Sequence, residues 1–311
     1  MPARASVDSR AVPRTLPAMS PALASLLDGL VDYAGLFPPA QLAMPEAVRA
    51  HADYLAGPHR RALGRFIVPL ARLAEFEQAH AALPPPAPHD WQLSVIGSGD
   101  SNADAAAISA FHARSATRIV SLEVKASSPA EITRATAALP HSLEVWLELS
   151  PRAPDLPALL AAVRAAGHGA KLRTGGVTPD AFPLPADVAR FLRLCRDTDV
   201  VTKATAGLHH PLRGDFPLTY APAAPRGRMF GFLNVTLAAA LLHAGGTEAD
   251  ATTLLDDADA QAFQIHADAL SWRGTRFSAA QLAATRRTLC RSFGSCSFTE
   301  PLEGLQQLSW L

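Results

Sequence analysis

From Leu63 onward, short runs of β-branched and other apolar residues alternate with Ala- and Leu-rich stretches of helical period. This alternation is typical of parallel strands joined by crossover helices. It predicts strands at 64–69, 91–97, 118–125, 143–149, 169–174 and 199–206, and helices at 71–83, 102–114, 129–139, 155–167 and 185–197. Less regular sequence after 207 predicts two more strands, at 229–233 and 263–272, and helices at 234–245 and 278–292. Eight strands in this order indicate an α/β fold, a (β/α)8 TIM-type barrel.

The chain length agrees with one such barrel and short extensions. A complete barrel takes roughly 250 residues, and the chain has 311. We therefore expect a disordered or extended N-terminus over 1–20 and a single barrel domain over 21–311. Two helices, at 21–31 and 44–56, form an expected N-terminal helical extension whose intervening 32–40 segment plugs one mouth, and the residues after 292 form a C-terminal tail.

Composition indicates a small-molecule protein rather than a nucleic-acid or membrane protein. The formal net charge is zero and no long basic run occurs, which removes the electrostatic reason to expect nucleic acid. The longest apolar stretch, 229–242, is shorter than a bilayer span, and the first twenty residues lack a secretory apolar core. Three cysteines give no disulfide framework. We expect a soluble, cytoplasmic chain that needs no cofactor, and the sequence leaves open whether it forms a homo-oligomer.

Charged residues fall on the strand faces that should point into the barrel. Alternate residues of a barrel strand face the helices or the lumen, and the helix-facing set must be apolar. This rule sends seven charged residues inward: Glu123, Lys125, Glu144, Glu148, Lys171, Arg173 and Lys203, with Ser121, Trp146 and Thr205 on the same faces. Unpaired buried ions are costly. One alternative is that the charges form a structural ion-pair network, or that the strands are shorter and the charges lie at a solvated rim. The other is that they form an active site at the C-terminal mouth, where barrels of this kind carry catalysis.

The segments KLRTGG (171–176) and VTKATAG (201–207) resemble the fifth and sixth strands of the deoxyribose-phosphate aldolase family of class I aldolases. In that family the sixth strand reads Lys-Thr-Ser-Thr-Gly and its Lys forms a Schiff base. The resemblance therefore implies a lyase in which Lys203 is the Schiff-base lysine and Lys171 an accompanying lysine. The family also has a second lysine on its seventh strand and a phosphate-binding glycine pair, which the 229–235 segment lacks. This departure implies a substrate other than that sugar phosphate.

Elementary chemistry assigns the neighbouring groups their roles. A lysine amine attacks a carbonyl only when deprotonated, and a nearby cation lowers its pKa. Lys171 and Arg173 could supply that effect to Lys203. Glu148 or Glu123 is the expected base, and Arg173 can bind a carboxylate or phosphate with two parallel hydrogen bonds.

Several polar residues outside these strands are further candidates for substrate contact. His209 and His210 directly follow strand 199–206, and Arg213 lies on the long irregular loop over 208–228. Asp32 precedes a stiff Gly- and Pro-containing run, and Asn234 either contacts substrate or caps a helix. Thr205 completes this group.

Two other functions remain open at this point. One is a metal-assisted hydrolase or isomerase using His209, His210 and Glu148, although no metal-ligand spacing accompanies the histidines. The other is a catalytically inactive barrel that binds a small anion. Glu300, in the tail, reaches the site only if the tail folds back.

Overall fold

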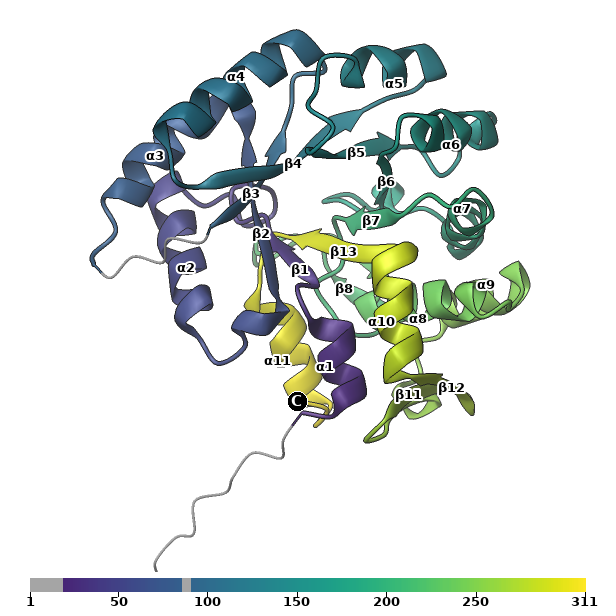
Figure 1. Ribbon diagram of the computed structural model, residues 1–311. Helices are drawn as coiled ribbons and strands as arrows, with labels where there is room; N and C mark the ends of the chain where they lie inside the picture. Colours follow the sequence, from purple (N-terminus) through teal and green to yellow (C-terminus); the bar gives the residue numbers. More distant parts are fainter. Residues whose placement is uncertain (1–18, 86–90) are drawn as a thin grey trace, which may run out of the picture.

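The computed structural model describes residues 19–85 and 91–311. The predicted disordered N-terminus lies almost entirely outside these ranges. Within them, eight parallel strands close into a barrel in the order β1-β13-β7-β6-β5-β4-β3-β2. Figure 1 shows the strands at the centre and the helices around them. The predicted (β/α)8 fold is confirmed.

The barrel strands are β1 (Val31–Tyr33), β2 (Leu63–Pro69), β3 (Gln92–Ile96), β4 (Arg118–Lys125), β5 (Glu144–Leu149), β6 (Gly169–Arg173), β7 (Thr202–Thr205) and β13 (Cys290–Ser295). The helices are α1 (Pro21–Leu27), α2 (Met44–Ala56), α3 (Leu73–Ala81), α4 (Ser101–Arg114), α5 (Pro129–Thr136), α6 (Leu156–Ala165), α7 (Pro185–Asp197), α8 (Phe232–His243), α9 (Glu248–Asp256), α10 (Ala279–Thr288) and α11 (Thr299–Gln307). Several helices begin where a serine side chain accepts a backbone N–H: Ser20 before α1, Ser128 before α5 and Ser278 before α10.

The first and last barrel strands differ from the prediction. The predicted 32–40 plug begins within β1, which pairs with β13 and β2 and closes the barrel, and its later residues Ala34, Phe37, Pro38 and Pro39 line a cavity at the C-terminal mouth. The predicted helix 278–292 ends at Thr288, and the chain then enters β13. Both strands were missed because β1 has only three residues and β13 is rich in small polar residues, so neither carries a strong β pattern.

The strands predicted at 229–233 and 263–272 are wrong as barrel strands. In the first region only Met229 is in a strand, as the last residue of β9 (Arg226–Met229), which pairs antiparallel with β8 (Gly214–Pro217), and α8 begins at Phe232. The second forms a three-stranded antiparallel sheet of β10 (Phe263–Ile265), β11 (Ala269–Trp272) and β12 (Thr275–Ser278). Consequently Lys171 lies on the sixth barrel strand and Lys203 on the seventh, one place later than predicted.

Two glycines make room for large or charged side chains inside the barrel. A Cβ at Gly169 would lie 2.4 Å from the Trp146 ring, and a Cβ at Gly64 would lie 2.4 Å from Oδ1 of Asp32. Apolar side chains such as Val145, Leu147 and Leu172 are buried in the core cluster, as the alternation predicts. The barrel wall is therefore apolar on the helix side, while polar and charged groups occupy the lumen.

Candidate functional site

A cavity of about 690 Å³ opens at the C-terminal mouth of the barrel. Its wall is built by the ends of the barrel strands and by the loops that follow them. Among the lining residues are Ile96, Gly97, Ser98, Glu123, Lys125, Glu148, Lys171, Arg173, Gly175, Gly176, Thr205, Gly207, His209, Gly294 and Cys296. The predicted position of the site, at the end where barrels of this class carry catalysis, agrees with this cavity.

Beneath the cavity, the Lys203 amine is completely enclosed by the barrel. Lys203 has no exposed surface and does not line the cavity. Its Nζ lies 2.6 Å from Oδ2 of Asp32 and 2.8 Å from Oε1 of Glu123. Ser292 donates to the same Asp32 oxygen at 2.9 Å. The lysine is thus an internal cation, held between carboxylates from β1 and β4.

The Lys171 amine lies one step nearer to solvent, at the floor of the cavity. Its Nζ is 2.7 Å from Glu123 and 2.7 Å from Glu148, and 6% of the residue is exposed. Glu148 also accepts a hydrogen bond from Nε of Arg173 at 3.3 Å. Cations and carboxylates therefore alternate from the lumen to the rim, in the order Asp32, Lys203, Glu123, Lys171, Glu148, Arg173. We call these six residues the ion chain.

Strand register explains how the sequence assembles the ion chain. Glu148 on β5 is level with Lys171 on β6, which is level with Lys203 on β7. Level residues on parallel strands point to the same face. The predicted convergence of Glu148, Lys171 and Lys203 on one face is therefore observed.

The charges in the ion chain stabilise one another. Burial alone would raise the pKa of Glu123, but Lys203 and Lys171 outweigh burial and hold that pKa well below its usual range. Burial alone would lower the pKa of Lys203, but Asp32 and Glu123 outweigh it and raise that pKa above its ordinary value. Burial also opposes ionisation of Glu148, and Lys171 and Arg173 reverse this, so its pKa is lowered. Lys203 and both glutamates are thus charged at neutral pH.

A histidine from the loop after β7 faces the cavity and pairs with the C-terminal segment. His209 lines the cavity, and its Nδ1 lies 2.6 Å from Oε2 of Glu300 on α11. The tail therefore folds back, which was the condition for Glu300 to reach the site. The Tyr220 hydroxyl, from the same loop as His209, lies 3.8 Å from Sγ of Cys296. A carboxylate that holds one ring nitrogen fixes the orientation of the imidazole and supports proton transfer at the other.

Four predicted substrate contacts lie away from the cavity, and one of them, Asp32, is bonded to Lys203 beneath it. His210 stacks on Phe216 with ring centroids 3.5 Å apart. Arg213 is buried, bonds Asp256 at 2.6 Å and lies over the Phe230 ring. Asn234 is on α8, where its amide accepts from the Arg213 backbone N–H and donates to the carbonyls of Leu254 and Asp257. Asn234 therefore fixes the loop to α8 and α9, a role closer to the capping alternative than to substrate contact.

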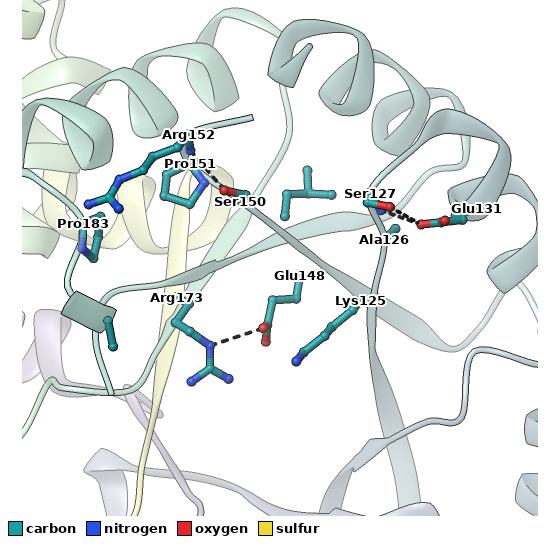
Figure 2. A pocket seen from close by; sticks show the side chains of 12 residues that line it. Lys125, Ala126, Ser127, Glu131, Glu148, Ser150, Pro151, Arg152, Arg173 and Pro183 are labelled. Carbon is teal, nitrogen blue, oxygen red and sulfur yellow. Dashed lines mark hydrogen bonds and ion pairs between the residues drawn. The ribbon is translucent and has the colours of Figure 1, made fainter. Parts of the chain in front are cut away.

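A second hollow, of about 490 Å³, adjoins the main cavity and shares part of its wall. Figure 2 shows Arg173, Glu148 and Lys125 pointing into it, with Arg152 at its edge. Within the described residues, Lys125 makes no hydrogen bond or ion pair, so its ammonium is available to a ligand. Arg152 instead bonds Asp187 at 2.9 Å. Lys125 and Arg173 form a positive rim beside the Lys171 amine.

Some groups at the site were absent from the sequence-based candidates. Ser292, Ser94 and Ser121 hydrogen-bond within the lumen: Ser94 donates to Glu123 at 2.9 Å, and Ser121 donates to Ser94 at 2.7 Å. Ser292 was missed because β13 was taken as helix. The glycines of 97–99 and 175–176 follow strand ends directly, and that position is the signal that could have identified them as cavity wall.

Within the described ranges, no three His, Cys, Asp or Glu side chains are placed to hold a metal ion. In the same ranges, no helix has both the length and the apolar character required to cross a bilayer. No protein-family model matches the chain. Comparison with curated proteins likewise gives no match. The site is therefore interpreted from its own geometry.

Proposed function

We propose that this barrel is a lyase of the class I aldolase type, which forms a Schiff base with a small carbonyl substrate that also carries a carboxylate or phosphate. The observation that carries the proposal is the Lys171 amine at the floor of the cavity, 2.7 Å from each of two glutamates. A reactive amine, an acceptor for its proton and a positive rim for an anion then lie in one concave site.

Lys171, rather than Lys203, is the proposed nucleophile. Lys203 is enclosed without contact with the cavity, and its raised pKa keeps it protonated and non-nucleophilic. Both lysines contact the same Glu123 carboxylate, so Lys203 holds that carboxylate in place beside the Lys171 amine. Lys203 is in this proposal a positioning residue.

The aldolase resemblance supports this chemistry, but its sequence motif and its strand position point to different lysines. The motif VTKATAG matches the family's Schiff-base segment at Lys203. The strand count instead puts Lys171 on the sixth strand, where that family has its Schiff-base lysine, and Lys203 on the seventh, where it has its second lysine. Access to the cavity supports Lys171 as the nucleophile.

The proposed reaction begins when Lys171 transfers a proton to Glu148 and its free amine attacks the carbonyl carbon. Loss of water, with the oxygen leaving after protonation, gives a protonated imine. This imine accepts the electron pair of the bond between the α- and β-carbons as that bond breaks, while the β-hydroxyl loses its proton and leaves as the carbonyl oxygen of the first product. The enamine that remains is protonated at the α-carbon, and hydrolysis of the resulting imine releases the second product and regenerates the amine. His209, held by Glu300, is the proposed group for moving the proton to or from the departing oxygen. Lys125 and Arg173 bind the anionic end of the substrate.

Borohydride trapping tests the proposal. The protein is incubated with short aldehydes, 2-oxo acids and phosphorylated aldehydes, reduced, and mapped by peptide mass spectrometry. We expect an adduct on Lys171 that is absent in Lys171→Met. The exposed Lys125 serves as an internal comparison for non-specific amine labelling, and Lys125→Met should keep the Lys171 adduct with uncharged aldehydes but weaken it with the anionic substrates. An adduct confined to Lys203 would overturn the choice of nucleophile. Saturable binding of these compounds without any specific adduct would favour the catalytically inactive anion-binding barrel.

No observation favours the metal-assisted alternative. It requires His209 and His210 together, and His210 stacks on Phe216 outside the cavity lining.

A further inference from the structure

A separate cavity of about 340 Å³ lies at the opposite, N-terminal mouth of the barrel. Its lining comes from the starts of the strands and from α2: Gly29, Asp32, His51, Leu55, Leu63, Gly64, Arg65, Gln92, Arg291 and Ser292. The N-terminal mouth of such barrels ordinarily contributes to stability. An open cavity lined by two arginines is therefore a feature that needs its own explanation.

The two arginines carry more positive charge than the one carboxylate that they share can neutralise. Nη1 of Arg65 and Nη1 of Arg291 both bond Glu144, on opposite carboxylate oxygens. Among the described residues, the Arg65 side chain has no other hydrogen-bond partner, and Arg291 has one more, the Arg287 carbonyl at 3.1 Å. Two guanidiniums facing one carboxylate leave one positive charge, with several N–H donors unused.

Asp32 does not neutralise this remaining charge. Its Oδ2 is already bonded to Lys203, and its Oδ1 accepts the backbone N–H of Arg65 at 2.8 Å. The side chains of Arg65 and Arg291 are 19% and 38% exposed, so solvent and solutes reach both guanidiniums.

His51 adds a second observation that points to a ligand. It lines the cavity with 1% of its surface exposed, and its Nδ1 is buried without a partner. Burial lowers the pKa of His51 to about 3, an effect that the nearby Asp32 only partly offsets, so the ring is neutral and Nδ1 can donate or accept. A buried polar nitrogen without a partner is unfavourable unless a ligand or water satisfies it.

We propose that the N-terminal mouth is a second binding site, for a small oxyanion of the carboxylate or phosphate class, held by Arg65 and Arg291 with His51 completing the contact. Planar guanidiniums match the geometry of both oxyanions. The site is spatially separate from the proposed Schiff-base site, because none of its lining residues lines the upper cavity, and Asp32 connects the two only through its ion pair with Lys203.

Calorimetric titration with sodium phosphate and, separately, sodium malonate tests the site, with chloride at matched ionic strength as the reference. We expect saturable binding of at least one probe, and the better probe identifies the class. Arg291→Gln should weaken that binding by about tenfold or more, because it removes a charge-assisted contact. Arg61→Gln is the matched control: it loses the same charge at an exposed position paired with Asp28 and should leave binding unchanged.

Two further variants keep the test sharp even if Arg291→Gln folds poorly. Glu144→Gln removes the competing carboxylate and should tighten binding several-fold, a gain that general destabilisation cannot imitate. Gln92→Phe fills the cavity mouth while retaining both arginines, and should abolish binding.

Arg173→Gln separates the two mouths. If binding is lost in Arg173→Gln but kept in Arg291→Gln and Gln92→Phe, the anion occupies the upper cavity and the second site is refuted, whatever the result of borohydride trapping. Absence of saturable binding with both probes would refute it as well.

Discussion

The two mouths of the barrel both contain ions, but they differ in how those ions are matched. From the lumen to the C-terminal mouth, three cations alternate with three carboxylates, and Lys203 and Glu123 within the lumen are almost completely buried. At the N-terminal mouth, Arg65 and Arg291 share Glu144 and remain partly exposed. Matched buried charges create a fixed environment for chemistry, whereas unmatched, accessible charges leave a place for a ligand. The comparison makes predictions that can be ordered by size.

The largest expected difference concerns stability. Glu123→Ala leaves Lys171 and Lys203 without a shared buried partner, and should lower the free energy of unfolding by about 3–5 kcal/mol. Glu144→Ala should cost less, about 1 kcal/mol, because solvent can hydrate both arginines. Urea denaturation of the two variants measures the difference. Equal losses would show that the two ion clusters are energetically alike.

The next effect concerns two histidines, one at each mouth. If His209 transfers protons in the proposed reaction, His209→Gln should slow formation of the trapped Lys171 adduct by about 100-fold. Glu300→Gln should give a smaller loss and a shifted pH profile, since Glu300 acts by holding His209. His51→Phe should leave the rate unchanged. The assignment fails if His51→Phe and His209→Gln slow the adduct equally.

Acid should affect the two mouths in different pH ranges. His51 is neutral when folded, with a pKa of about 3, but its ordinary pKa is 6.5. The unfolded chain therefore binds a proton that the folded chain does not, and stability falls as pH drops below about 6.5. Glu123 has a lowered pKa when folded, so its contribution is complete above its ordinary value of 4.5 and is lost only below it.

Urea midpoints at pH 7, 5.5 and 4 test this separation. Relative to the wild type, His51→Phe should lose less stability between pH 7 and 5.5, and Glu123→Gln should lose less below about pH 4.5. Asp32 and His80 also act on His51 and oppose each other. If the stability of His51→Phe falls between pH 7 and 5.5 as much as that of the wild type, the prediction for His51 is contradicted.

The smallest effect is expected at the outer edge of the N-terminal mouth. The Arg61 and Asp28 side chains are 76% and 62% exposed and 3.5 Å apart. Arg61→Gln should leave the urea midpoint unchanged within error, because exposed ion pairs contribute little. A clear loss would mean that charges outside the cavity lining also stabilise this mouth.

The local sequence pattern of each barrel strand explains which strands could be predicted. The six central strands were predicted because each alternates or is continuously apolar over four or more residues, and their alternation correctly placed Glu123, Glu148, Lys171 and Lys203 inside the barrel. The strands β1 and β13 could not be predicted in this way. Each is stabilised by pairing with distant segments rather than by its own residues, as when Val31 pairs with Phe293.

Those two missed strands also explain the errors at the site. Without β1 and β13, the strand count was displaced by one, and Asp32 and Ser292 could not be recognised as the partners of Lys203. Two candidates in the 208–234 region, Arg213 and Asn234, lie away from the cavity for another reason: they are polar residues that hold a loop together, and the sequence does not distinguish this from ligand contact.

The pairing of β1 with β13 has a consequence for synthesis on the ribosome. Asp32 is translated early, but its hydrogen-bond partner Ser292 follows 260 residues later. Until β13 emerges, the nascent barrel cannot close. The Asp32 carboxylate, which is buried in the complete barrel, is then exposed at the gap. Forming contacts so distant in sequence is slow because the intervening chain must first be ordered. A nascent chain arrested before residue 290 should therefore be protease-sensitive, even when its other strands are complete. It should bind neither the carbonyl substrate at the C-terminal mouth nor the oxyanion at the N-terminal mouth.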